Sequence, residues 1–486
     1  MQAFAPVTAD DVAALVGIVG REGVITQEDE VGLLVYGRDE TEDWQYRPEV
    51  AVRPRTTEEV AAILRHASAR RLPVTPRGAG TGLSGGALPV FGGIVLSLAR
   101  MDRILEIDAG NRMARVQPGV INQVLQEAVG RHGLYYPPDP ASWGSCQLGG
   151  NIAENAGGPH AVKYGVTKDW ILSLEAVRAD GEVFRTGGKL RKDVAGYNLT
   201  QLLVGSEGTL AIVTEAVVRL IPRPTQRRTL VAPFDDLDTA ARAMVALYEA
   251  RVMPSTLEVV ERAALEAAAE HLGRRVPHQE AEAQILLEVD GYDEASVEGE
   301  LARAGETLLD AGALDVLVAD TPAKERELWA VRRCLGEAVK KQAAYIECDT
   351  AVPPSEVPAL FRGVRDIARR FGIRQISYGH AGDGNIHVNV LSGGADPAAR
   401  EERLRPAVEA IFDLAVSLGG TITGEHGVGC AQSRHLPKCR DAIALEVMAA
   451  VKRAFDPLGI LNPGKILPVD IPPPASTRAP LTGRPA

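Results

Sequence analysis

Apolar residues near the amino terminus recur with the 3.6-residue period of an α-helix and predict two helices. The first is expected between Thr8 and Gly20, and the second begins at Thr56 or Thr57. The threonines can cap the helix starts with a side-chain oxygen, and Gly20 can end the first helix. The apolar faces are Val12, Leu15, Val16 and Val19 in the first helix and Val60, Ile63 and Leu64 in the second.

Short apolar runs bounded by turn residues then predict a series of strands as far as residue 220. These runs are 72–74, 93–98, 104–107, 113–116, 174–177, 183–184 and 210–220, and a helix is expected from about 120 to 129. Asp180 and Gly181 are typical of a tight hairpin between the two runs that flank them. The pattern predicts a compact α+β unit that ends at the proline-containing stretch 221–224.

The pattern changes from about residue 226. Strand-like runs at 229–231, 285–289 and 314–318 alternate with Ala- and Glu-rich helices, which predicts a second α+β domain with an antiparallel sheet. We therefore expect a first domain at 1–224, a second at 225–455 and a return to the first at 456–470. The Pro-, Ser- and Thr-rich tail, 471–486, is expected to be disordered.

Composition and charge exclude several classes of protein. A chain of 486 residues is too long for one core, and 45% hydrophobic with 24% charged residues is the balance of a soluble globular protein. The net charge of −11, without a Lys/Arg-rich block, disfavours nucleic-acid binding. No apolar run approaches the ~20 residues of a membrane span, and residues 1–10 do not resemble a secretory signal. The five cysteines form no CxxC motif, which favours a reducing, cytoplasmic location and argues against a cysteine-ligated cluster.

A glycine-rich loop at 76–86 is the first candidate for chemistry. Gly80, Gly82 and Gly85 satisfy GxGxxG, the fingerprint of a Rossmann nucleotide site. A Rossmann loop opens a helix, however, whereas this loop precedes the strand expected at 93–98. Glycines still allow successive backbone N–H groups to approach an anion, so the loop predicts a phosphate site of another kind; the alternative is a flexible surface loop.

Further motifs occur in a fixed order along the chain: Pro137-Pro-Asp-Pro140, the Gly- and Asn-rich segment 149–158, segment 192–198 and segment 205–213. With the glycine-rich loop, they resemble the vanillyl-alcohol oxidase / para-cresol methylhydroxylase flavoprotein family. The chain is most similar to its D-2-hydroxyacid dehydrogenase branch, which includes D-lactate dehydrogenase, the glycolate oxidase flavoprotein subunit and D-2-hydroxyglutarate dehydrogenase. The resemblance, over residues 30 to 468, implies a two-part FAD-binding domain and an α+β substrate cap domain.

The resemblance also implies how FAD is held. The glycine-rich loop would wrap the pyrophosphate, segments 137–140 and 149–158 would face the flavin ring, and segments 192–198 and 205–213 would lie near the adenosine half. Ala87 stands where some members have a flavin-linked histidine, so the FAD would be noncovalent. The implied FAD-binding residues are Pro76, Arg77, Gly78, Ala79, Gly80, Thr81, Gly82, Ser84, Gly85, Gly86, Pro138, Asp139, Gly149, Gly150, Asn151, Asn155, Gly157, Gly158, Glu207, Gly208, Ile212 and Asn462.

A histidine cluster lies in the second half of the chain. Alternation of Ile386, Val388 and Val390 puts His387 and Asn389 on the opposite face of a strand, and a Gly-rich turn can bring His380 beside His387. Gly424-Glu425-His426-Gly427 follows a helix that ends at 419–420. Two histidines and a glutamate could form a divalent metal site with open positions. Hydrogen-bonded core histidines and a nonheme iron oxygenase site are the alternatives.

The resemblance implies roles for these residues. His380, His387 and Glu425 would hold Zn or Mn, and His426 would be the catalytic base. Arg332, which follows Trp329, would grip the substrate carboxylate, and Asn389 would be a further substrate contact. Glu347 stands where hydroxyglutarate enzymes have a lysine that meets the distal carboxylate, so a small monocarboxylate is favoured.

The expected activity is the FAD-dependent oxidation of a small 2-hydroxy acid, such as glycolate or D-lactate, to the 2-oxo acid. The metal would polarise the hydroxyl, His426 would take its proton and flavin N5 would accept the hydride. The alternatives are a D-2-hydroxyglutarate dehydrogenase, the flavin subunit of a glycolate oxidase complex and a flavin-dependent alkyl-glycerone-phosphate synthase. The electron acceptor would be a quinone, a cytochrome, an electron-transfer flavoprotein or an iron–sulfur partner subunit, which could place the protein at the membrane periphery. A homodimer is left open.

Overall fold

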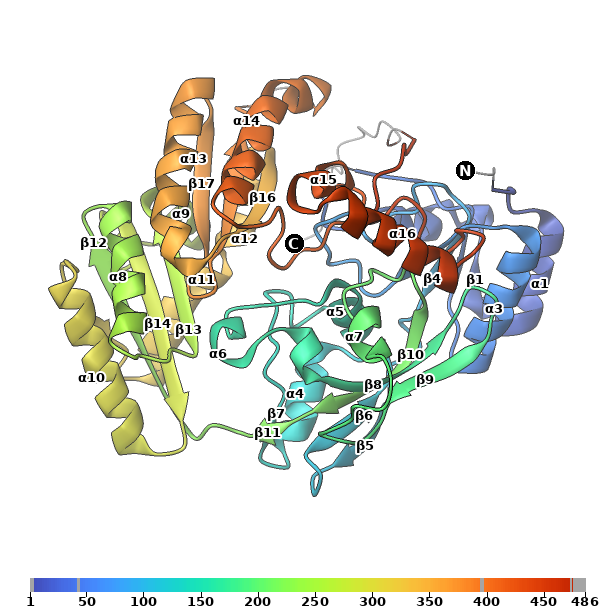
Figure 1. Ribbon diagram of the computed structural model, residues 1–486, viewed down its shortest axis with the longest axis horizontal. Helices are drawn as coiled ribbons and strands as arrows, with labels where there is room; N and C mark the ends of the chain where they lie inside the picture. Colours follow the sequence, from blue (N-terminus) through green and yellow to red (C-terminus); the bar gives the residue numbers. More distant parts are fainter. Residues whose placement is uncertain (1–3, 42–43, 394–396, 473, 475–486) are drawn as a thin grey trace.

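The computed structural model describes residues 4–41, 44–393, 397–472 and 474, and it has two parts (Figure 1). One part contains a four-stranded and a five-stranded sheet, and the other is built on a seven-stranded sheet. The last long helix, α16 (Ala442–Phe455), lies against the first part, so the chain returns there after completing the second (Figure 1).

The four-stranded sheet has the order β1 (Val24–Ile25), β2 (Val50–Val52), β4 (Ile94–Ser97), β3 (Val74–Arg77). Helices α1 (Ala9–Val19) and α3 (Thr57–Arg70) contribute Leu15, Ile63 and Leu64 to its core, and the short α2 spans Glu30–Leu34. Thr8 and Thr56 cap the two long helices, as their sequence predicts. Strand β3 begins at Val74 and continues to Arg77, later than the run 72–74, because it pairs with β4 as far as Ser97.

The five-stranded sheet is antiparallel throughout. Its order is β5 (Ile104–Asp108), β6 (Met113–Val116), β10 (Ile212–Arg219), β8 (Ile171–Val177), β9 (Val183–Gly187). The expected hairpin through Asp180 and Gly181 is present as β8 and β9. Around this sheet lie α4 (Asn122–Gly130), α5 (Leu148–Glu154), α6 (Ala161–Tyr164), α7 (Leu199–Leu203) and the paired β7 (Leu134–Tyr135) and β11 (Ile221–Pro222).

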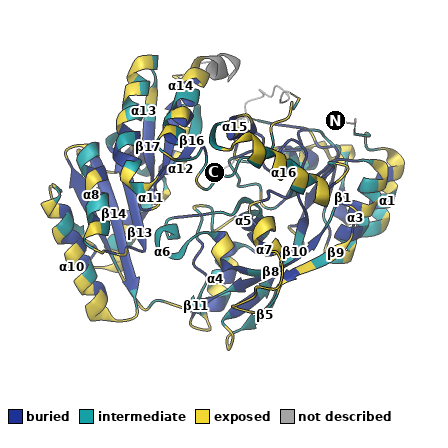
Figure 2. Cartoon of the chain, in the orientation of Figure 1, coloured by how far each residue is buried: buried dark blue, intermediate teal, exposed yellow. Residues whose placement is uncertain are grey.

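The seven-stranded sheet is also antiparallel, as the second half of the sequence predicts. Its order is β15 (Leu317–Val318), β12 (Gln226–Phe234), β14 (Ala283–Gly291), β13 (Thr256–Glu261), β17 (Arg374–His380), β18 (Asn385–Leu391), β16 (Tyr345–Ala351). One face packs on α8 (Leu237–Glu249), α10 (Glu294–Asp310), α13 (Val357–Phe371) and α14 (Pro397–Ser417). The other face packs on α9 (Arg262–Leu272), α11 (Pro322–Arg333) and α12 (Leu335–Gln342). Figure 2 shows buried strands between helices that expose their outer sides.

Strand alternation brings polar residues to one face of this sheet. Ile386, Val388 and Val390 enter the apolar core, so His387 and Asn389 point to the opposite face, as the sequence predicts. The same parity applies on the neighbouring strands, since Leu257, Val259, Ile285, Leu287 and Cys348 also enter that core. The polar face therefore carries Glu258, Glu288, Glu347, Asp349, His380, His387 and Asn389, which are all buried or nearly so.

The return segment is fastened to the glycine-rich part. Leu461 bridges Val74 at the edge of β3, and the Asn462 N–H donates to the Val74 carbonyl over 2.8 Å. The buried Asp456 carboxylate accepts the N–H groups of Ile460 and Leu461. The segment is thus held beside the glycine-rich loop. The tail expected to be disordered, 471–486, falls almost wholly outside the described residues.

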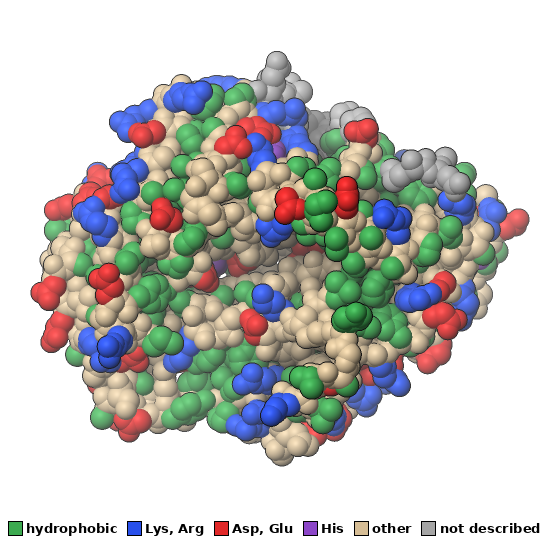
Figure 3. Space-filling view, viewed as in Figure 1, with side chains coloured by type: hydrophobic (Ala, Val, Ile, Leu, Met, Phe, Trp, Pro, Cys, Tyr) green, Lys and Arg blue, Asp and Glu red, His purple; other side chains and the backbone are tan. Residues whose placement is uncertain are grey.

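Two further observations concern the surface. Segment 192–198 is exposed throughout, and Val194 and Tyr197 are 97% and 96% exposed. Apolar side chains gather over the neighbouring α7 and α16 in Figure 3.

Within the described part of the chain, no helix combines the length and apolar character that crossing a membrane requires.

Candidate functional site

A cleft lies where the glycine-rich loop, α5 and the turn before β10 meet the loop that follows α14. Its lining includes residues 76–83, 149–151 and 206–208 from the first part of the molecule. Glu425 and His426, which follow the seven-stranded sheet in the chain, line the same cleft. The two regions that the sequence singles out, more than three hundred residues apart, therefore share one cavity.

Three glycines of the cleft wall have no structural need to be glycine. Gly78, Gly82 and Gly150 all have ordinary backbone angles. A Cβ atom at Gly78 or Gly82 would come no closer than 3.5 Å to other atoms, and one at Gly150 would meet nothing within 4 Å. Because neither packing nor backbone strain excludes a side chain, the missing Cβ atoms keep the cleft open for a ligand.

The backbone of the glycine-rich loop offers donors to such a ligand. Among the described residues, no acceptor pairs with the N–H groups from Gly78 to Leu83. Buried oxygens of Gln147, Glu154 and Asn462, which also line the cleft, have no hydrogen-bond partner in the same part of the chain. A run of free N–H groups binds phosphate oxygens, so the donor set fits a dinucleotide with a pyrophosphate.

Most of the residues expected to hold FAD line this cleft, and six do not. Those in the lining are Pro76, Arg77, Gly78, Ala79, Gly80, Thr81, Gly82, Gly86, Gly149, Gly150, Asn151, Gly157, Glu207, Gly208, Ile212 and Asn462. Ser84, Gly85, Pro138, Asp139, Asn155 and Gly158 lie outside the lining, and segment 192–198 is absent from it as well. Gly85 and Gly158 have positive φ, so they serve the turns behind the wall.

His380, His387 and Glu425 converge beside the cleft. Glu425 Oε1 lies 3.0 Å from His380 Nε2 and 3.5 Å from His387 Nε2. The three ligand atoms lie within 4.8 Å of one another, close enough for one ion to contact all three. The pKa of Glu425 is lowered to about 2, because the neighbouring histidines outweigh the effect of its burial. The carboxylate is thus ionised, as a metal ligand must be.

A buried ion pair orients His380 from behind. Glu258 Oε1 lies 2.6 Å from His380 Nδ1, so His380 Nε2 is left to face Glu425. Arg332 donates through Nε to the other oxygen of Glu258, and its guanidinium lies over the Tyr378 ring. A carboxylate behind a ligating imidazole is the usual support of a metal-bound histidine. Arg332 therefore already has a carboxylate partner in the protein, and its contact with a substrate stays a prediction.

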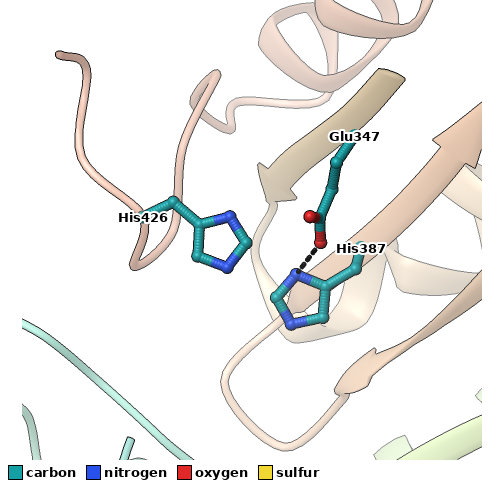
Figure 4. A group of neighbouring side chains, drawn as sticks. All are labelled: Glu347, His387 and His426. Atoms are coloured by element: carbon teal, nitrogen blue, oxygen red, sulfur yellow. Dashed lines mark ion pairs between the residues drawn. The ribbon is translucent and has the colours of Figure 1, made fainter. Parts of the chain in front are cut away.

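His426 stands against the face of His387 (Figure 4). The two rings are stacked with centroids 5.1 Å apart and planes 12° apart. His426 Nε2 lies 4.0 Å from Glu425 Oε1, while its Nδ1 lies 3.9 Å from Asp349 Oδ2. Burial lowers the pKa of His426, but the carboxylates of Asp349, Glu347 and Glu425 raise it overall.

Glu347 offers a second grouping with the same histidines. Its Oε1 lies 3.4 Å from His387 Nδ1, and Glu347, His387 and His426 also bring one possible ligand atom each within 4.8 Å (Figure 4). His387 Nδ1 has no hydrogen-bond partner among the residues described. The structure thus presents two overlapping candidate metal sets that share His387.

Asp349 organises the loop that carries Glu425 and His426. Its Oδ2 accepts the N–H groups of Gly424, Glu425 and His426 over 2.8–2.9 Å, and the Thr423 hydroxyl donates to the same atom. Asp349 is fully buried, yet its pKa lies well below its usual value, because neighbouring histidines and hydrogen bonds offset the burial. The side chains of Glu425 and His426 therefore project from a backbone fixed by one carboxylate.

Sequence reasoning missed several of these residues. Glu258 could have been suspected, because it is an acid within the apolar run Leu257–Val260. No local signal marks the supporting role of Asp349. His160 was also missed: its ring bridges Asp139, at 2.5 Å, and the fully buried Glu288, at 3.2 Å. His160 thus joins the two parts of the molecule, and Asp139 binds His160 outside the cleft lining.

Comparison with known proteins agrees with this geometry. A profile described as the C-terminal domain of FAD-linked oxidases matches residues 223–466. A second profile, described as an FAD-binding domain, matches residues 48–187. The first covers the polar sheet face and the loop with His426, and the second covers the glycine-rich loop.

Relatives match over almost the whole chain. The glycolate oxidase subunit GlcD of Bacillus subtilis is 41% identical over 96% of this chain and 98% of its own length. The D-lactate dehydrogenase of Anaerostipes hadrus is 37% identical over 86% and 90%. The structure of p-cresol methylhydroxylase superposes with a TM-score of 0.75 over 96% of this chain and 98% of that one, at 17% identity, which establishes the vanillyl-alcohol oxidase type of fold. The chain therefore belongs to the FAD-linked oxidases.

Proposed function

We propose that this protein oxidises a small 2-hydroxy acid, of the glycolate or D-lactate type, to the 2-oxo acid, with noncovalent FAD as the electron acceptor. The observation that carries the proposal is the shared cleft, in which glycine-rich segments meet Glu425 and His426. The names of the two relatives support this substrate class. Ala87 lines the cleft, so that position has no side chain able to bond covalently to a flavin.

The oxidation removes two hydrogens from the substrate, one as a proton and one as a hydride. Bound FAD supplies the hydride acceptor. His426 takes the hydroxyl proton at Nε2, the ring nitrogen on the side of Glu425. Asp349 lies on the Nδ1 side and stabilises the imidazolium that forms. The His426 N–H donates to Asp349, which fixes the backbone that carries the ring.

We propose that His380, His387 and Glu425 hold a divalent ion, Zn or Mn, rather than the set that includes Glu347 and His426. His380 Nδ1 is occupied by Glu258, so its Nε2 is oriented for a ligand, and His426 is left free as the base. The carboxylates of Glu258, Glu347 and Asp349 lie beside these histidines, and the guanidinium of Arg332 pairs with Glu258, so the remaining negative charge favours a cation. A metal bound there would lower the pKa of the substrate hydroxyl.

Glu347 supports a short monocarboxylate as substrate. Its side chain is 15% exposed and lies beside His387, on the polar sheet face. A negative charge there repels a distal carboxylate, whereas glycolate and D-lactate have none. Arg332 and Asn389 are the proposed contacts of the substrate carboxylate, although Asn389 already donates its amide to the Ile376 carbonyl.

We infer that electrons leave the FAD for an external acceptor, namely a quinone, a cytochrome, an electron-transfer flavoprotein or an iron–sulfur partner subunit. The name of the Bacillus subtilis relative, a subunit of glycolate oxidase, supports a partner protein. Among the described residues, no cysteine belongs to a group that could hold a metal ion.

The glycine at position 150 gives a direct test of the FAD site. In Gly150→Leu the new side chain would enter the cleft, so FAD affinity should fall roughly tenfold or more, which needs only about 1.4 kcal/mol of lost binding. The apoprotein should gain up to ~0.8 kcal/mol, because leucine favours a helix over glycine. FAD content and thermal melts measure both. Gly299→Leu, at an exposed position of α10, is the control and should keep its FAD. Equal FAD content in both variants would contradict the assignment.

Substrate choice tests Glu347. Anaerobic mixing with glycolate or D-lactate should bleach the flavin. The kcat/KM for D-2-hydroxyglutarate should be lower than that for D-lactate by about tenfold or more. Glu347→Gln should reduce the difference in kcat/KM between the two substrates, because it removes the repelling charge. Glu337→Gln, exposed on α12, should leave that difference unchanged. If no 2-hydroxy acid reduces the flavin, the proposed function is wrong. If the difference in kcat/KM is unchanged in Glu347→Gln, only the role of Glu347 is wrong.

Metal removal tests the ligand set. Dialysis against a chelator should slow flavin reduction roughly tenfold or more, with FAD content unchanged, because the substrate hydroxyl would lose its polarising ion. Zn or Mn should restore the rate in the wild type but not in His380→Ala. A rate that is indifferent to the chelator rules out the metal.

The base is tested by His426→Ala. Flavin reduction should slow by about 10²–10⁴-fold, the usual contribution of a general base, while FAD stays bound. Stopped-flow absorbance at the flavin band measures the rate. His132→Ala removes an exposed histidine and should behave as wild type. If His426→Ala reduces the flavin as fast as the wild type, another group must accept the proton of the substrate hydroxyl.

A further inference from the structure

The loop that carries Glu425 and His426 is held from two sides. Asp349, from the seven-stranded sheet, accepts the N–H groups of residues 424–426. Glu207, from the first part of the molecule, accepts the next pair: Oε1 takes the Val428 N–H at 2.7 Å, and Oε2 takes the Gly429 N–H at 2.8 Å. Residues 424–426, 428 and 429 thus donate to two carboxylates, one on strand β16 and the other in the turn between α7 and β10.

The environment of Glu207 is built for this contact. The residue is 5% exposed and has φ +51°, a left-handed conformation that is unusual for glutamate. Its N–H donates to the Ala153 carbonyl, and its own carbonyl accepts from Asn462 Nδ2. The backbone of Glu207 is therefore fixed between α5 and the return segment, and a strained conformation persists only where its surroundings enforce it.

The loop side of the contact is equally close. Gly427 has φ +85°, and a Cβ atom on it would lie 2.0 Å from Glu154 Oε2 and 3.1 Å from Glu207 Oε1. Gly429 has φ +50°, and its Cβ would overlap the Ser84 carbonyl at 1.9 Å. The two glycines that follow His426 thus let the loop backbone reach the first part of the molecule without a side chain between them.

We propose that Glu207 is a positioning residue for His426, which it aligns from across the domain boundary by binding the backbone that follows the base. This inference rests on the proposed function, because it gives His426 the role of base. Glu207 lines the cleft, and its carboxylate serves the loop rather than the cofactor. The base is thereby placed relative to the cofactor-binding part, although the chain delivers it from the other part.

The geometry explains why one carboxylate would not suffice. Asp349 fixes the loop relative to the sheet that holds His380 and His387, and so fixes Glu425 relative to its partners. Glu207 fixes the same loop relative to the glycine-rich wall. An error of about 1 Å in the placement of a reacting group can cost about 10²-fold in rate, so both contacts bear on the reaction.

The test compares Glu207→Gln with Glu175→Gln in the holoenzyme. Glutamine keeps the size of Glu207 but turns an NH₂ donor toward a loop N–H. Glu175 is a matched control: it is 7% exposed in the same part of the molecule and accepts from Thr57 and Thr214, away from the loop. In Glu207→Gln, hydrogen exchange at residues 424–429 should accelerate, and the limiting rate of flavin reduction by D-lactate should fall about 10–100-fold. The apparent substrate Kd and the FAD content should stay within about threefold.

Other outcomes overturn the inference. Unchanged exchange and reduction in Glu207→Gln, or equal losses in Glu175→Gln, would remove the positioning role. Loss of FAD would show that Glu207 serves the cofactor. Glu207→Asp, which keeps the charge on a shorter side chain, should give an intermediate rate with FAD retained, and it replaces the glutamine variant if that one does not fold. If no 2-hydroxy acid reduces the wild type, the proposed function fails, and the exchange comparison alone decides whether Glu207 holds the loop.

Discussion

The arrangement of this protein depends on the hydrogen bonds between two buried carboxylates and the backbone that carries Glu425 and His426. Asp349 lies on strand β16 and Glu207 in the turn before β10, and each accepts N–H groups of the same loop. Other contacts, such as the one between His160 and Glu288, also join the two parts, but these carboxylates hold the loop itself. Through them, the loop with Glu425 and His426 is bonded both to the polar sheet face and to the cleft wall.

The polar face of the seven-stranded sheet shows how buried charged groups are paired. Burying a carboxylate or an imidazole is costly unless it is paired, and every buried acid on this face has such a partner. Glu258 has His380 and Arg332, Glu288 has His160 and Trp329, and Asp349 has the loop amides. The apolar helices on the opposite face supply the core that supports this polar layer.

Local pattern predicted the elements well and the contacts of the site less well. The capped helices α1 and α3, the hairpin of β8 and β9 and the facing of His387 follow from residues within one or two turns of each other. The partners of Arg332 and Asp139 cannot be predicted from nearby residues. Glu258 and His160 reach them only after separate strands and loops are assembled. Glu207 shows the same limit: its segment was recognisable, but its side chain serves residues more than two hundred positions away.

Cofactor binding and reaction chemistry place different demands on a chain, and this explains why they lie in different segments. A pyrophosphate is bound by backbone N–H groups, so its site appears as glycines clustered within a few residues. Proton removal needs a few side chains at fixed distances, and a sheet provides such distances across strands that are remote in sequence. A loop that is hydrogen-bonded to both parts can connect the two. In this protein that loop has Gly427 and Gly429 within three residues after His426, where close approach to Glu154 and Ser84 leaves no room for a side chain.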